Sequence, residues 1–258
     1  MINVVKIGGG IIEDDAQLAA FLQSFSQISG PKILVHGGGR LATTIGKKLG
    51  IEAKMVEGRR VTDAETLQLV TMVYGGLANK RIVAQLQSNG INAMGLTGAD
   101  GGVILSVKRP VKKVDYGFVG DVKSVNAELL ATLITQGVVP VLAPLTHDGA
   151  GNMLNTNADT IASEVAKALA LSGRATQLTF GFELNGVLRD FNDKTSVIPV
   201  INQDTYEMLK VQGIIADGMI PKLDSAFCAL SAGVKRVRIC HALEVGVASI
   251  GAAGTVIE

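Results

Sequence analysis

The sequence predicts an α/β protein: a three-layer αβα sandwich around a mostly parallel central sheet, divided into two lobes. Short β-branched runs alternate with longer amphipathic stretches, which is typical of a parallel sheet covered by helices on both faces. Hydrophobic residues make up 47% of the chain and charged residues only 18%, which excludes intrinsic disorder. Two glycine triplets follow predicted strands and precede predicted helices, as in ligand-binding α/β sheets.

The first half of the chain contains two strand–glycine–helix units followed by a long helix. Apolar residues at helical spacing and β-rich runs place these elements. Gly75 and Gly76 interrupt the long helix, at a cost of about 1 kcal/mol each relative to alanine, which close packing against a second helix would offset. The expected strands are 3–7 and 32–35, and the expected helices are 16–25, 39–49 and 64–89.

The pattern changes to β structure in the middle and then returns to alternation. Thr156 or Asn157 can cap the helix at 158–171, and residues 147–152 have the composition of a hairpin turn. A lobe boundary is expected at Gly173, which gives lobes of residues 1–173 and 174–258. The remaining expected strands are 103–107, 112–119, 137–142, 176–180, 236–239 and 254–257, and the remaining expected helices are 204–212 and 222–232.

Charge, cysteine content and termini exclude several classes of protein. A net charge of +1 argues against a nucleic-acid-binding surface, and no apolar run reaches the roughly 18 residues that a membrane span needs. The N-terminal segment does not read as a secretion signal, so a cytoplasmic enzyme is expected. Cys228 and Cys240 are too few and too far apart for a zinc site, and no metal-ligand cluster is assigned.

The glycine triplets predict a site that binds phosphate. Glycine lets the backbone approach a ligand closely, and its N–H groups together with a helix N-terminus form a cradle for an anion. A tight turn is the alternative, but one glycine suffices for that. The two triplets are Gly8–Gly10 and Gly37–Gly39.

Charged residues near these turns fit phosphoryl transfer, which needs cations and backbone donors aimed at the transferring group. Lys6 sits inside an apolar strand and needs an anionic partner, although its side chain could instead reach a sheet edge. Lys222 at a helix start opposes the helix dipole, which a bound phosphate would compensate, unless it is simply solvated. Asp159 lies in the first turn of a predicted helix, where the helix dipole by itself favours an acidic residue, so its presence does not require a catalytic role. Arg60 suits bidentate binding of a carboxylate or forms an ordinary surface pair.

A nicotinamide-dependent oxidoreductase is the rival reading of the second triplet. Residues 37–42 match the G-x-G-x-x-A form of the dinucleotide fingerprint, and Glu57 follows at a suitable distance. The fingerprint would then lie on the second βα unit and leave Lys6 and the first triplet unexplained. No G-x-x-x-x-G-K-[ST] motif occurs, which excludes a P-loop.

Five motifs together resemble the amino-acid kinase family and, within it, the N-acetylglutamate kinases. They occur in the family's order and at its spacing, so the resemblance covers essentially the whole chain. The first motif is shared with carbamate, uridylate and aspartate kinases, whereas the third and fourth are more specific for acylglutamate kinases. The motifs are Lys6-Ile7-Gly8-Gly9, His36-Gly37-Gly38-Gly39, Gly58-Arg59-Arg60-Val61-Thr62, Leu154-Asn155-Thr156-Asn157-Ala158-Asp159 and Asp217-Gly218-Met219-Ile220-Pro221-Lys222.

The resemblance implies the amino-acid kinase fold and transfer of the ATP γ-phosphoryl group to the side-chain carboxylate of N-acetyl-L-glutamate, in arginine biosynthesis. It implies that Lys6 and Lys222 stabilise the phosphoryl group and that Asp159 orients both lysines. Residues 1–173 would bind the acylglutamate and dimerise, and residues 174–258 would bind ATP, with Mg²⁺ held through the nucleotide phosphates. The implied contacts are Gly8 and Gly9 to phosphate, Gly38, Gly39, Arg60 and Asn155 to the acylglutamate, and Glu183, Leu184, Asn185, Gly186, Val187, Leu188, Ile214, Ile215 and Ala216 to ATP.

Two departures from the family pattern qualify these expectations. Glu183 replaces the usual Asp in the nucleotide segment. Arg59 replaces the usual Leu before Arg60, and an added cation could accept an added carboxylate. N-succinyl-L-glutamate is therefore an alternative substrate. A kinase for another small acid and a catalytically silent binding module are the remaining alternatives.

The oligomer is expected to be a homodimer that arginine does not inhibit. Arginine-inhibited members of the family carry an extra N-terminal helix that builds hexamers, and here the strand with Lys6 starts almost at Met1. The helix at 64–89, with Gly75 and Gly76, is expected to form part of the dimer interface.

Overall fold

The structure is a computed structural model that describes residues 1–215, 219–249, 251 and 253–258. Its centre is an eight-stranded sheet in which the strand pairs are parallel except for one antiparallel pair near an edge, β13–β14. The predicted mostly parallel sheet is confirmed. In order across the sheet, the strands are β12 (Val200–Ile201), β14 (Thr255–Ile257), β13 (Arg236–His241), β11 (Thr176–Phe182), β1 (Ile2–Ile7), β2 (Lys32–His36), β8 (Val139–Leu142) and β5 (Ala93–Leu96).

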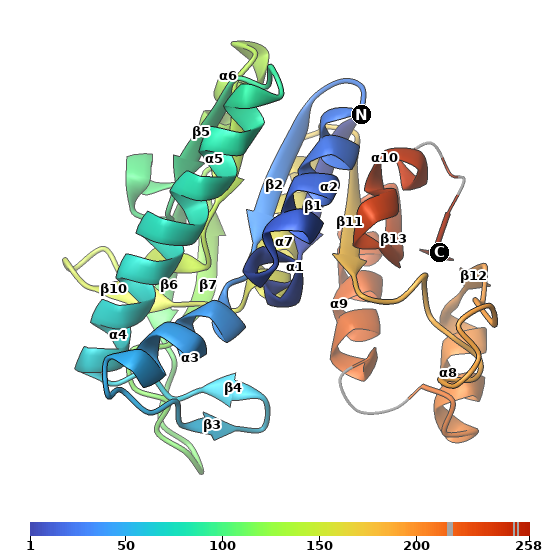
Figure 1. Ribbon diagram of the computed structural model, residues 1–258. Helices are drawn as coiled ribbons and strands as arrows, with labels where there is room; N and C mark the ends of the chain where they lie inside the picture. The colour runs from blue at the N-terminus through green and yellow to red at the C-terminus, as the bar shows by residue number, and fades with distance from the viewer. Residues whose placement is uncertain (216–218, 250, 252) are drawn as a thin grey trace.

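Helices cover both faces of this sheet, which confirms the three-layer sandwich (Figure 1). Alternate residues of a strand point to opposite faces, so Val4 packs into the core on one face and Val5 into the core on the other. The first face is covered by α6 (Ala127–Thr135), α7 (Ala158–Leu171), α8 (Gln203–Val211) and α9 (Met219–Ser231). The second is covered by α1 (Gly9–Glu13), α2 (Asp15–Ser26), α5 (Asn79–Ser88) and α10 (Val245–Ala248).

The sheet passes without interruption through both predicted lobes, because β1 pairs in parallel with β11. In Figure 1, β1, β2 and β11 lie side by side in the centre, with the C-terminal helices on the right. The division at Gly173 stays a prediction. In the described part of the chain, no helix has both the length and the apolar character needed to span a bilayer.

A smaller four-stranded sheet lies beside the main one and corrects one sequence prediction. Its strands are β10 (Met153–Asn155), β9 (Leu145–His147), β6 (Ile104–Lys108) and β7 (Gly120–Val125). The strand expected at 112–119 is wrong: this segment is a loop that precedes β7. Gly117 has a positive φ of 70° and packs against the backbone of Thr62, which breaks the extended path. The predicted turn at 147–152 does join a hairpin, β9–β10.

The long helix expected at 64–89 forms as one helical stretch of three parts. These are α4 (Ala64–Val70), a π-helical segment η1 (Thr71–Ala78) and α5. Gly75 and Gly76 both lie in the π-helical segment, so they loosen the helical turns there without ending the helix. The remaining elements are α3 (Gly39–Lys48), the hairpin strands β3 (Met55–Val56) and β4 (Arg59–Arg60), and the 3₁₀ turns η2 (Asp100–Gly102) and η3 (Ala242–Glu244).

A buried polar contact joins α5, β8 and β2 next to the second glycine triplet. The side-chain amide of Asn79, at the start of α5, donates to the backbone oxygen of Val141 on β8 at 2.9 Å and lies 3.1 Å from Nε2 of His36 on β2. His36 is fully buried. Burial lowers the pKa of His36 to about 4, because the charged imidazolium loses its hydration.

The low pKa of His36 predicts acid sensitivity of the fold. Above about pH 6.5 the imidazole is neutral in both states, and between pH 6.5 and 4 the unfolded chain binds the proton more readily. The free energy of unfolding should therefore fall by about 3 kcal/mol over this range. Urea unfolding of the wild type and His36→Gln from pH 4 to 8 measures it, with His241→Gln as the control. Parallel pH dependence in wild type and His36→Gln would contradict the assignment.

Candidate active site

The two glycine turns lie side by side at the carboxyl ends of β1 and β2, because these strands are parallel neighbours in register. The N–H of Gly37 donates to the oxygen of Ile7 at 3.0 Å, which ties the turns together. A Cβ on Gly37 would lie 3.1 Å from the backbone nitrogen of Gly9, and one on Gly38 would lie 2.7 Å from the ring of Tyr74. Both positions therefore favour glycine for close approach of the chain, and glycine turns of this kind can offer backbone N–H groups to an anion.

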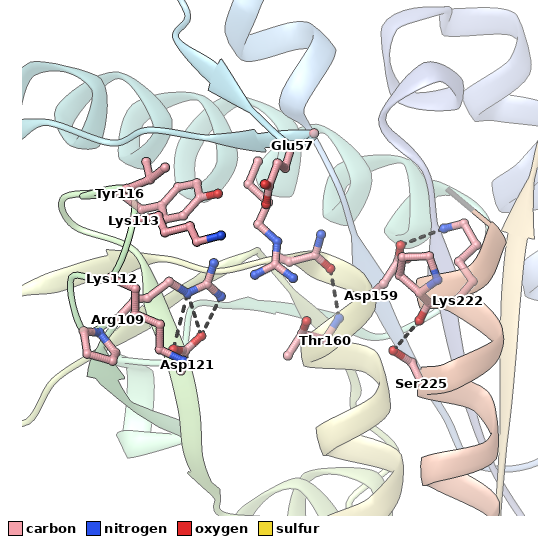
Figure 2. Close-up of a pocket in the computed structure, with 16 residues that line it drawn as sticks. Glu57, Arg109, Lys112, Lys113, Tyr116, Asp121, Asp159, Thr160, Lys222 and Ser225 are labelled. Atoms are coloured by element: carbon pink, nitrogen blue, oxygen red, sulfur yellow. Dashed lines mark hydrogen bonds and ion pairs between the residues drawn. The ribbon is translucent and has the colours of Figure 1, made fainter. Parts of the chain in front are cut away.

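Lys6 and Lys222 meet on one carboxylate, that of Asp159. Lys6 points from β1 toward α7, on the same side of the sheet as Val4, and its Nζ lies 2.7 Å from Oδ1 of Asp159. Nζ of Lys222 donates to Oδ2 of Asp159 at 2.7 Å (Figure 2). The side chain of Asn157 caps α7 by accepting from the N–H of Thr160, and this cap fixes the turn that carries Asp159.

The charges in this cluster depend on one another. Burial raises the pKa of Asp159, but the attraction of Lys6 and Lys222 outweighs it and holds the pKa at about 2. Burial lowers the pKa of Lys6; Asp159 acts against this effect, and Lys222 adds to it. The carboxylate of Asp159 is therefore held between two lysine ammonium groups, and Lys6 and Asp159 line the same cavity as the glycine turns.

Arg60 and Asn155 lie in the same cavity as the glycine turns. Nη2 of Arg60 donates to the backbone oxygen of Gly39 at 2.9 Å and to Oγ1 of Thr43 at 2.7 Å, so the guanidinium is fixed beside the second turn. The amide of Asn155 donates to Oγ1 of Thr62 at 3.0 Å. A cavity of about 520 Å³ has among its walls the candidate residues Lys6, Gly9, Gly38, Gly39, Arg60, Asn155 and Asp159.

The segments expected to bind ATP meet the glycine turns at Glu183, which contacts Arg40 on the wall of the cavity of about 520 Å³. Neither of the two cavities described here is lined by described residues of 183–188 or 214–215. Val187 and Ile215 are buried in the main core, and Glu183 accepts from Nη1 of Arg40 at 2.9 Å. Ala216 lies outside the described residues. The predicted roles therefore stay predictions for Gly8, Glu183, Leu184, Asn185, Gly186, Val187, Leu188, Ile214, Ile215 and Ala216.

A second cavity of about 930 Å³ contains cations that the sequence analysis did not single out. Arg109, Lys112 and Lys113 line it, on the loop between β6 and β7, together with Arg59. In Figure 2, Arg109, Lys112 and Lys113 lie on one side of this cavity, and Asp159 and Lys222 lie on the other. The run of basic residues at 109–113 was the available sequence signal.

Lys222 lies in the first turn of α9 instead of starting the helix as the sequence predicted, since the described helix begins at Met219.

Among residues 1–215, 219–249, 251 and 253–258, no group of three or more His, Cys, Asp or Glu side chains is placed to hold a metal ion. The paired Lys6 and Lys222 and the backbone donors of the glycine turns can stabilise a phosphoryl group, and Arg60 can hold a carboxylate nearby.

Cationic and glycine-rich groups at the ends of parallel strands define the class of phosphate-handling α/β enzymes. The chain belongs to the amino acid kinase family, whose sequence pattern matches residues 1–241. This match confirms the family predicted from the five motifs.

Relatives named acetylglutamate kinase match nearly the whole chain. The one from Phocaeicola vulgatus is 60% identical over 100% of this chain and 98% of its own length. The one from Bacteroides thetaiotaomicron is 63% identical over 92% of both chains. The solved carbamate kinase from Giardia lamblia bound to AMP-PNP superposes with a TM-score of 0.70 at 15% identity, over 99% of this chain and 97% of that one, which shows a shared fold.

Proposed function

We propose that this protein is a kinase that transfers the γ-phosphoryl group of ATP to the side-chain carboxylate of N-acetyl-L-glutamate, as a step of arginine biosynthesis. Relatives that share about 60% of its residues over nearly its full length bear the name acetylglutamate kinase. The observation that carries the proposal is the Lys6–Asp159–Lys222 cluster in contact with the cavity that contains Arg60.

The reaction needs positioning and charge neutralisation more than proton transfer. A carboxylate is ionised at neutral pH, so its oxygen attacks the γ-phosphorus without a general base. The new O–P bond forms as the bond from the γ-phosphorus to the β–γ bridging oxygen breaks, and ADP leaves with that electron pair. Lys6 and Lys222 lower the repulsion between the two anions, and Asp159 holds both ammonium groups in place.

The remaining site residues would bind the ends of the two substrates. Nη2 of Arg60 donates to Gly39 and Thr43, which fixes the guanidinium where it would pair with the α-carboxylate. Asn155 and the N–H groups of the second glycine turn would hold the rest of the acylglutamate, while Gly8 and Gly9 would approach phosphate. Mg²⁺ would be held chiefly by the ATP phosphates, where it neutralises negative charge.

Hydroxamate trapping tests this function directly. Purified protein with Mg-ATP and N-acetyl-L-glutamate should form a product that hydroxylamine traps, because an acyl phosphate is the expected product. Free glutamate and reactions without ATP serve as controls. Folded protein that binds ATP but gives no trapped product with any N-acylglutamate would refute the proposed function, and a silent binding module or a kinase for another small acid would then be favoured.

A homodimer in the cytoplasm is the assembly we propose. Met72 and Leu77, in the π-helical part of the long helix, are 58% and 49% exposed, and Gly76 between them permits close approach of a second helix. A second copy that packs this face would bury both side chains. Light scattering should give a dimer mass, and Leu77→Lys should shift it toward the monomer; a monomeric wild type would refute the assembly.

A further inference from the structure

The second cavity adjoins the first. Gly58, Arg59, Arg109, Asn157 and Asp159 line both cavities, so the two spaces share a wall along the substrate site. A ligand held between Arg60 and the lysine cluster therefore has a volume of about 930 Å³ directly beside it.

The described residues that line this volume carry a net positive charge. Arg109 is paired with Asp121, with its Nη2 at 2.6 Å from Oδ1. In the described part of the chain, no carboxylate lies within ion-pair distance of Arg59, Lys112 or Lys113. Glu57, on the same wall, offsets one of these three charges. The wall thus offers an excess of cations to an anionic group.

The hairpin fixes Arg59 between the two cavities. Glu57 and Gly58 both have positive φ, 48° and 72°, which forms the tight two-residue turn of the β3–β4 hairpin. Arg59 and Arg60 follow this turn as neighbours on β4. Arg60 is buried beside the second glycine turn, whereas Arg59 is exposed and reaches both cavities.

The α-carbon of an N-acylglutamate has three non-hydrogen substituents to place. Under the proposed function, the side chain would extend to Lys6 and Lys222, and the α-carboxylate would pair with Arg60. The acylamide would then face the wall that Arg59 and Arg109 share with the second cavity. An acetyl group would end short of this volume, whereas a longer acyl chain would enter it.

We infer that the acyl group this enzyme prefers ends in a carboxylate, as in N-succinyl-L-glutamate, and that Arg59 binds that carboxylate, with Lys112 and Lys113 contributing attraction. The inference rests on the proposed function and specifies its substrate. The phosphoryl step is unchanged, since the distal carboxylate does not react. Arg59 is a specificity-determining residue in this account.

Values of kcat/KM for three acyl groups separate charge from size. The wild type should use N-succinyl-L-glutamate about 10- to 100-fold better than its neutral amide, the N-succinamoyl compound of the same length, because one charge-assisted contact is lost. It should also use the succinyl compound better than N-acetyl-L-glutamate. A wild-type preference for acetyl, or equal use of the succinyl and succinamoyl compounds, would overturn the inference and leave the proposed function in place.

Arg59→Leu tests the assigned contact. It should lower the preference for succinyl over succinamoyl by about 10-fold or more, with the KM for ATP unchanged. Lys54→Leu, an exposed cation near the same hairpin that lines neither cavity, should leave the preference unchanged. If Arg59→Leu instead raises the KM for ATP and keeps the succinyl preference, the cations serve the nucleotide and the inference fails. Absence of product with every acylglutamate would refute the proposed function itself.

Discussion

Lys222→Ala is expected to lower kcat by about 10³-fold with little change in the KM for the acylglutamate. The ammonium of Lys222 shares Asp159 with Lys6, so its charge acts where negative charge shifts during phosphoryl transfer. Interactions that strengthen only in the transition state appear in kcat, and one cation aimed at a transferring phosphoryl group is worth roughly 10³-fold or more. Steady-state kinetics with Mg-ATP measures both constants.

Lys210→Ala is the matched control. Lys210 lies on α8 and pairs with Glu207 at 3.1 Å at the surface, away from the two cavities. It should retain wild-type kinetics, and both variants should show thermal unfolding close to the wild type, because the Lys222 side chain is partly exposed. A kcat within threefold of the wild type in a folded Lys222→Ala protein would remove this lysine from the mechanism.

Asp159→Asn is expected to lower kcat by about 10²-fold and to move the alkaline limb of the kcat–pH profile to lower pH. Burial already lowers the pKa of Lys6, and Asp159 is the group that opposes this effect. Without the carboxylate, Lys6 faces Lys222 alone, so its pKa falls further and its proton is lost at lower pH. Kinetics from pH 6 to 10 measure the shift.

Glu164→Gln, on the same helix α7, controls for the loss of a carboxylate. Glu164 pairs with Lys167 at 2.9 Å, and its replacement should leave the pH profile unchanged. Asparagine nearly matches aspartate in shape, so the Asp159 variant tests charge more than packing. The positioning role would be refuted by an Asp159→Asn enzyme whose lower kcat came with an unmoved alkaline limb, since a purely structural loss predicts that result.

Local patterns in the sequence were sufficient to predict most of the helices and strands. The helix expected at 158–171 forms as α7 with Asn157 as its cap, and the strand expected at 3–7 forms as β1. Elements with weak periodicity were not found: β5 is short and only partly buried, and α6 follows a loop that was taken for a strand.

Sequence alone determined that Lys6 needs an anionic partner, and it predicted that the glycine turns bind an anion and that Arg60 binds a carboxylate, because each follows from the chemistry of a residue in its local setting. Only the tertiary structure decided which groups meet. Strand order and helix packing bring Lys6 and Lys222 onto the two oxygens of Asp159, and they set Arg59 against the basic loop at 109–113. No local pattern encodes such contacts, since they arise from segments far apart in the chain whose placement depends on burial of the whole core.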